Sequence, residues 1–437
     1  MADYILDPVP LAFALPQECC TTPSYRRFPP HWCQFLYSFI CSLSGSRDGA
    51  YMSAFITIFN SLSFAIERTY AIPSISRVLS GTGELRSGPT VSKRYLDTAI
   101  IVGTWGICPV STKEPPSEFY AEHVGSQVAS TDPRTYIAIA RMNWIHSHYK
   151  IPKTLKQSND DYLYTLALFV LEPRWTRRYG WRPLSQLEIH ARYVFYRHVG
   201  EMMNIYDIPG SIAELETWAD DYEMRCMAPT NTNHELAEGM LEELVSSVPS
   251  VFRGLLKRIA ICVMDERMKK AMKLPAQPRV LHALVSIGAA LMRLFGRHLL
   301  LPRTHAKCVV PIEYPAPPLD GRLVRTHPIL MFSKVTKPWY APRTAGISRV
   351  LEKIALAVGL ISADGIPGPQ YNDEGYRLEE LGPHRWKNGT CQSFSSAFSS
   401  LTYGRVAGHA EVMKQASEMM GCPVQSVWAR DVAGGIA

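Results

Sequence analysis

The sequence lacks several features that mark common classes of protein. It has no block of five or six like charges, and its formal net charge of +7 is spread over 437 residues, so we expect no nucleic acid as partner. Its ten cysteines have no CxxC spacing, which favours a reducing compartment over a disulfide framework. The GxSxG, GxxxxGK[ST] and HExxH motifs are absent, and no GxGxxG follows a strand pattern. The sequence therefore does not favour a hydrolase or a nucleotide-binding protein.

Long apolar segments are also missing. Asp3 and Asp7 precede a short apolar stretch at the N-terminus, so we expect no signal peptide. The run from Phe35 to Leu43 is about half as long as a spanning helix requires. Residues 283–301 form a longer segment, but Arg and His side chains interrupt it, which is typical of an amphipathic core helix or a membrane-surface helix. Peripheral membrane contact therefore stays open.

Helical periodicity dominates the rest of the chain and predicts an all-α fold, a large helical bundle with a smaller irregular C-terminal region. Ser185 with Glu188, and Ser211 with Glu214, have the spacing of capping boxes at helix starts. Apolar residues between 55 and 66 have helical spacing that stops at Pro73. The other predicted helices are Ser92–Trp105, Tyr136–Tyr149, Asp160–Tyr179, Ser185–Met203, Ser211–Met227, Asn233–Val245, Val251–Met272 and Pro278–Leu300.

Composition divides the chain into four parts. Residues 1–50 are rich in Pro, Cys and aromatic side chains and predict a loosely structured leader. Residues 51–303 form the predicted helical catalytic domain. A Pro-rich connection from 302 to 318 leads into a C-terminal accessory region, residues 304–402, and residues 403–437 are predicted to be a tail.

One histidine lies where helical spacing places apolar side chains. In the predicted helix from 136 to 149, Ile139, Met142 and His146 lie on one stripe, so His146 is predicted to point inward. An inward imidazole needs a partner for each nitrogen, and an iron atom can be one of them. The competing interpretation is an ordinary buried histidine with hydrogen-bond partners. His148 lies about 200° further round the helix, so the two imidazoles are not predicted to share one metal.

A second candidate cluster combines charge and a hydroxyl group. Arg94, Asp97 and Thr98 have i, i+3 and i+4 spacing and are predicted to share one helical face. A cation, a carboxylate and a hydroxyl group there could polarise dioxygen and move a proton. The alternative is an ion pair between Arg94 and Asp97 at the start of a helix.

These segments resemble a known family. The strings Lys93–Thr98, Ile139–His146, Asp161–Phe169 and Glu172–Pro173 are similar to the fungal ER-bound oxygenases of the mycophenolic acid pathway, whose wider family includes the latex-clearing rubber oxygenases. Further similar strings are Tyr70–Ser76, Tyr179–Leu184, Gly200–Ile205, Met264–Met272 and Tyr376–Pro383. In order along the chain, they cover most of residues 60–390.

The resemblance implies an all-α fold with a globin-like core, haem b as cofactor, and oxidative cleavage of a C=C bond by dioxygen. The implied substrate is a hydrophobic isoprenoid-like molecule, within fungal secondary metabolism. Arg141 and His146 match the family's Arg-x-x-x-x-His pattern, which makes His146 the implied iron ligand and Arg141 an implied haem-binding residue. Arg94 and Thr98 match distal residues of the rubber oxygenases, whereas Asp97 stands where those have Lys. No counterpart of their distal acid is identified upstream of Arg94.

The predicted location is intracellular, either cytoplasmic or peripheral on the endoplasmic reticulum membrane. The predicted function is a haem-dependent oxygenase, with Arg94, Asp97 and Thr98 as catalytic residues, His146 as metal ligand and Arg141 at the cofactor. Two alternatives remain. One is a haem peroxidase or hydroxylase, and the other is a helical protein that binds an apolar lipid or isoprenoid without catalysis.

Overall fold

The computed structural model describes a set of separate ranges of the chain. These are residues 62–85, 89–108, 110, 132–148, 158–171, 183–246, 248–299, 310–311, 322–325, 337–357, 365–383, 408–422 and 424. The predicted leader, residues 1–50, lies outside them, and so does the Pro-rich connection except for residues 310 and 311.

The described ranges are helical, which confirms the predicted all-α class. They contain no β-strand, only an isolated antiparallel bridge between Leu323 and Tyr376. The α-helices are α3 (Pro73–Thr82), α4 (Pro89–Ile107), α6 (Arg134–His148), α7 (Asn159–Leu171), α9 (Gln186–Met202), α10 (Ile212–Cys226), α11 (Asn231–Val245), α12 (Ser250–Val263), α13 (Glu266–Ala271), α14 (Arg279–His298), α15 (Gly346–Ala357) and α16 (His409–Met420). Two short 3₁₀ helices are η6 (Pro369–Tyr371) and η7 (Leu378–Glu380). No helix of the described part is both long and apolar enough to cross a bilayer.

Local capping fixes several helix starts. Ser185 forms the predicted capping box, since its hydroxyl accepts from the Glu188 backbone while Glu188 accepts from the Ser185 backbone. Ser211 makes only half of one, because the Glu214 carboxylate accepts from the backbone of Gly210 instead.

The predicted helix from Val251 to Met272 is two helices in the structure. Helix α12 ends at Val263, and Asp265 caps the start of α13 by accepting from the backbone of Met268. The carboxylate of Asp265 satisfies a backbone donor that would otherwise be left unpaired at the new helix start, and this stabilises the break.

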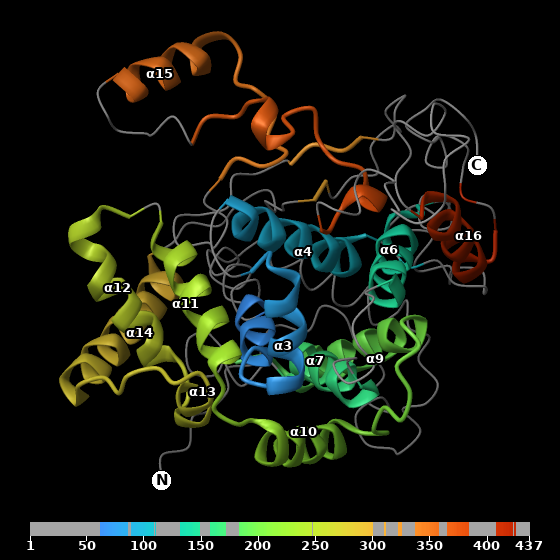
Figure 1. The fold of residues 1–437 in the computed structure, drawn as a ribbon, viewed down its shortest axis with the longest axis horizontal. Coiled ribbons are helices and arrows are strands. Elements are labelled where there is room, and N and C mark those ends of the chain that lie inside the picture. Colours follow the sequence, from blue (N-terminus) through green and yellow to red (C-terminus); the bar gives the residue numbers. More distant parts are fainter. Residues whose placement is uncertain are drawn as a thin grey trace.

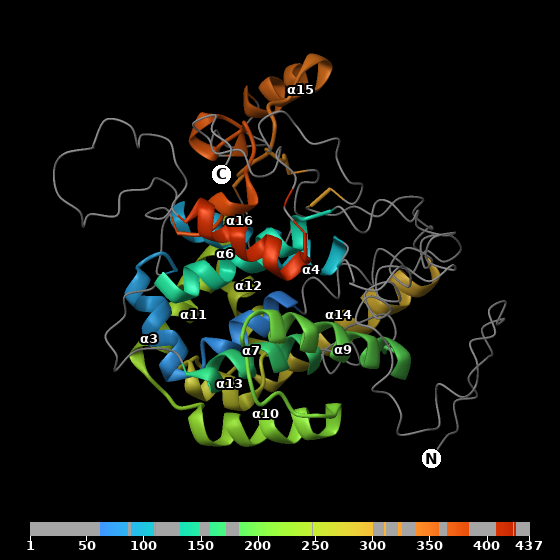
Figure 2. The ribbon, with the colours of Figure 1, turned by 90° about the vertical axis from the view of Figure 1, so that its right-hand side faces the viewer.

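Figures 1 and 2 show how the helices are arranged. Helices α4, α6 and α16 lie side by side above α3, α7, α9 and α10, and α11 to α14 form the left-hand edge of Figure 1. Helix α15 stands apart from the others in both views. Buried side chains form two clusters. One joins α4, α6, α7 and α9 to C-terminal segments, and the other joins α11, α12 and α13 to residues that flank α3.

The C-terminal segments are part of the first cluster. Helix α16 lies within the predicted tail and packs along α6, and η7 also contacts α6. Gly408 precedes α16 and has φ of 77°, in the left-handed region that residues with a side chain rarely adopt. A Cβ atom on Gly408 would overlap with the Trp144 ring, so this approach of α16 to α6 needs a glycine.

Candidate functional site

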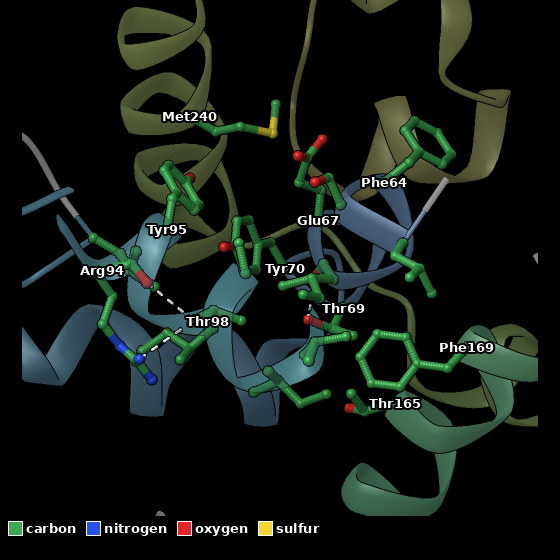
Figure 3. A pocket seen from close by; sticks show the side chains of 18 of the residues that line it. Phe64, Glu67, Thr69, Tyr70, Arg94, Tyr95, Thr98, Thr165, Phe169 and Met240 are labelled. Atoms are coloured by element: carbon green, nitrogen blue, oxygen red, sulfur yellow. Dashed lines mark hydrogen bonds between the residues drawn. The ribbon is translucent and has the colours of Figure 1, made fainter. Parts of the chain in front are cut away.

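A cavity of about 520 Å³ lies where the two clusters of buried side chains meet. Its wall is mostly apolar and comes from residues 62–75 and from α4, α6, α7, α11 and α12. Figure 3 shows Phe64, Tyr70, Tyr95, Phe169 and Met240 around it. A volume of this size lies within the range of roughly 300–1,000 Å³ that is usual for ligand and cofactor sites.

Two of the predicted catalytic residues line this cavity from α4. Arg94 and Thr98 are half-buried there, one turn apart. The Arg94 guanidinium donates to the Thr98 hydroxyl at 3.3 Å, and that hydroxyl donates to the Arg94 carbonyl at 3.0 Å (Figure 3). The pair places a permanent positive charge and a hydroxyl group at one side of an apolar space.

Asp97 does not line the cavity. Its carboxylate is fully buried and accepts from Lys93 Nζ at 2.6 Å, the Tyr340 hydroxyl at 2.8 Å and the Gly382 backbone at 3.1 Å. The cavity residues of α4 centre about 140° round the helix from Asp97, so i, i+3 spacing with Arg94 is not enough to bring it to the same space. Asp97 joins α4 to the C-terminal segment.

His146 reaches the cavity from the last turn of α6. It lines the wall one turn after Met142, which is the inward direction that the helical spacing predicts. The Tyr162 ring of α7 packs beside the imidazole, with 4.9 Å between ring centroids. No described residue makes a hydrogen bond to either ring nitrogen.

The surroundings of His146 keep its imidazole neutral. Burial lowers the pKa of His146 to about 4, and the positive charge of Arg94 acts in the same direction. Neutral imidazole is the form that binds iron, and a nitrogen without a hydrogen-bond partner in the described ranges is able to do so. The chemistry of His146 therefore fits a ligand of haem iron.

Arg141, the predicted haem-binding residue, does not line the cavity. Its side chain is fully buried, donates from Nε to the Leu381 carbonyl at 3.0 Å and lies over the Trp144 ring at 4.8 Å. It is about 140° round α6 from His146. Like Asp97, it fastens the C-terminal segment that precedes Pro383 to a helix of the site.

The other candidate histidines do not line the cavity. His148 is exposed and its Nδ1 lies 2.9 Å from the Trp144 carbonyl. His190 and His198 belong to α9, and Nδ1 of His198 lies 3.8 Å from Oε2 of Glu201. Across the described ranges, no three His, Cys, Asp and Glu side chains come together as metal ligands.

Several polar residues of the cavity wall are not predicted as site residues from the sequence, among them Glu67, Tyr70 and Tyr95 (Figure 3). Glu67 is buried although it carries a carboxylate. Burial raises the pKa of Tyr70 to about 12 and that of Tyr95 well above its usual value, so both phenols keep their protons. The signal for Glu67 was available, since it follows Phe64 and Ile66 within an apolar helical segment.

Comparisons with known proteins agree on one family. The model of the catalytic domain of the ER-bound oxygenase mpaB/B'/rubber oxygenase family matches residues 120–297. The chain is 29% identical to the ER-bound oxygenase mpaB' of Penicillium brevicompactum, over 73% of this chain and 72% of that protein. It is 32% identical to the ER-bound oxygenase mpaB of Penicillium roqueforti (strain FM164), over 48% of this chain and 67% of that protein. A solved structure of latex clearing protein in the closed state aligns with a TM-score of 0.40 and 18% identity, over 63% of this chain and 71% of that one.

Proposed function

Since the chain belongs to the ER-bound oxygenase mpaB/B' and rubber oxygenase family and is an oxidoreductase of the oxygenase class, we propose that it uses haem b and dioxygen to cleave a C=C bond in an isoprenoid-like molecule. The observation that carries the proposal is the neutral imidazole of His146 in the wall of an apolar cavity, with Arg94 and Thr98 in the same wall. The proposed location is the endoplasmic reticulum, which the names of the ER-bound relatives support, and the proposed role is in fungal secondary metabolism.

The overall reaction needs no external reductant. One molecule of dioxygen and one C=C bond give two carbonyl groups, because the double bond and the O–O bond both break while two C=O bonds form. A bound haem would supply the oxygen chemistry. The remaining tasks are to hold the cofactor, admit an apolar substrate, keep out water and move protons, and these fall to the side chains of the chain.

Each cavity residue has a task that its chemistry fits. His146 would bind the iron, as its neutral ring and lack of a hydrogen-bond partner within the described ranges support. Arg94 and Thr98 would stabilise negative charge that develops on oxygen, because a fixed cation and a hydroxyl donor in an apolar wall act with little screening. Glu67 would be the group able to accept a proton there, and Tyr70 and Tyr95 would stay donors.

The predicted roles of Asp97 and Arg141 change in this proposal. Neither side chain lines the cavity, and both are held by the segment around Leu381 and Gly382. We assign them to positioning: Asp97 orients α4, which carries Arg94 and Thr98, and Arg141 orients α6, which carries His146.

The test begins with the purified protein and its absorbance spectrum. Haem loading gives a Soret band, and His146→Ala should remove at least nine-tenths of it. His148→Ala is the matched control, since it changes the same residue type two positions further along α6 at an exposed site. A full Soret band in His146→Ala would overturn the assignment of the ligand.

The alternatives predict different results. An oxygenase consumes dioxygen with a prenylated substrate and yields carbonyl products without added peroxide. Product that forms only with hydrogen peroxide would support a peroxidase, and a hydroxylated product with an intact carbon chain would support a hydroxylase. Colourless protein that still takes up apolar ligands would support a carrier without catalysis.

A further inference from the structure

Helix α14 exposes a long apolar stripe. Val280, Leu284, Ile287, Leu291, Leu294 and Phe295 are all exposed, Val280 by 71% and Leu291 by 61%. With about 100° per residue they fall within an arc of about 100°, so they form one continuous face over most of the helix. Among the described helices, α14 packs mainly against α12, and this packing leaves the apolar face exposed.

Helix α12 extends the same apolar surface. Val251, Phe252 and Leu255 are exposed on it, Val251 by 77%. Helices α12 and α14 pack together at the left-hand edge of Figure 1, away from α9 and α16. A soluble protein seldom leaves so large a set of apolar side chains in water without a partner.

The charge of the two helices is of one sign. Their sequences contain Arg253, Lys257, Arg258, Arg279, Arg293 and Arg297 but no Asp or Glu. Arg258 and Arg279 are exposed and have no partner among the described residues, and Arg258 lies on the same side of α12 as Val251. Apolar side chains flanked by basic ones are complementary to a bilayer that contains anionic lipid.

We infer that the surface formed by α12 and α14 docks on a membrane that contains anionic lipid. The neighbouring side of α12, centred about 80° round the helix from its exposed apolar side chains, lines the cavity through Leu256, Ile259, Ala260 and Val263. A docked bilayer would therefore lie one helix away from the cavity, which is where an apolar substrate would leave the lipid. Docking itself does not depend on the proposed haem chemistry, so vesicle binding and oxygenase activity can fail separately.

Vesicle flotation with the full chain tests the docking surface. Phosphatidylcholine vesicles with about a quarter phosphatidylserine should carry the wild-type protein, and Leu284→Glu/Leu291→Glu should weaken this partitioning by at least about tenfold. The control is Tyr206→Glu/Met224→Glu, which adds the same charge at two exposed residues outside α12 and α14, and it should bind as the wild type does. Arg258→Gln/Arg279→Gln should reduce the preference for anionic over neutral vesicles by several-fold.

A second measurement does not depend on any variant. Amide hydrogen exchange of the wild-type protein should slow in α12 and α14 when anionic vesicles are added, and α10 should not change. Equal vesicle binding by the wild type and Leu284→Glu/Leu291→Glu would overturn the proposal. So would a failure of the wild type to bind, or a dimer in solution that the same substitutions dissociate.

Discussion

The role of Asp97 can be tested by removing its carboxylate. In Asp97→Ala, the Lys93 ammonium stays buried, and the Gly382 carbonyl, at 3.3 Å, is the hydrogen-bond partner that it keeps among the described residues. The Tyr340 hydroxyl and the Gly382 backbone also lose their acceptor. Breaking a buried ion pair from one side costs about 3–5 kcal/mol. We therefore expect a loss of at least about 3 kcal/mol in the free energy of unfolding.

Urea unfolding followed by circular dichroism measures this loss. Lys93→Met/Asp97→Leu removes both charges, so it should recover much of the stability, as buried pairs replaced by apolar side chains often do. Asp97→Asn keeps the shape of the side chain, and its folded, haem-loaded fraction should retain turnover within about twofold of the wild type.

The opposite pattern would refute this reasoning. If Asp97→Asn left the free energy of unfolding unchanged but lowered turnover by the roughly 100-fold or more that is typical of a lost proton-transfer group, Asp97 would be catalytic, as the sequence pattern predicts. A stable Asp97→Ala variant would likewise show that the ion pair with Lys93 contributes little.

Three further predictions follow from the same geometry. Arg94→Ala should keep the Soret band but lower turnover by about 100-fold, whereas Arg94→Lys should recover part of it, as measured by dioxygen consumption. Burial lowers the pKa of His146 to about 4, so between about pH 6.5 and 4 the unfolded chain binds a proton that the folded chain does not. As the pH falls through this range, the haem-free protein should therefore lose up to about 3 kcal/mol in the free energy of unfolding. In His146→Leu, urea titrations should show a shallower fall. Gly408→Ala should lower the free energy of unfolding by about 2–4 kcal/mol, because φ is positive at this residue and the new Cβ atom would meet the Trp144 ring. A melting temperature within about 1 °C of the wild type would contradict this.

The helices of the fold could largely be predicted from local signals. Periodicity and caps placed α9 and α11 to within a few residues of the bounds in the structure. The sequence predicts Pro73 only as the end of a helix, but Pro73 also begins α3, since proline fits the first turn, where its missing N–H costs nothing. The break between α12 and α13 was missed because the capping role of Asp265 is visible only once the chain turns there.

The residues of the candidate site divide in the same way, into those that local helical spacing places and those that distant contacts hold. His146, Arg94 and Thr98 reach the cavity because the faces of their own helices direct them there, and periodicity contains that information. Asp97 and Arg141 are held by partners 240 or more residues away in the sequence. Helical spacing contains the ion pair of Asp97 with Lys93, at i and i+4, but not these distant contacts. A carboxylate that joins α4 to the C-terminal segment and a catalytic acid therefore have the same pattern in the sequence.

These distant partners give the C-terminal segment a part in the geometry of the site. The Gly382 backbone donates to Asp97 on α4, and the adjacent Leu381 carbonyl accepts from Arg141 on α6. Gly382 has φ of 114°, and a Cβ atom there would lie 2.7 Å from Ile145, the neighbour of His146. Two consecutive residues thus fasten together the helix that carries Arg94 and Thr98 and the helix that carries His146. The spacing between these groups in the cavity wall therefore depends on a segment that lines no part of the cavity.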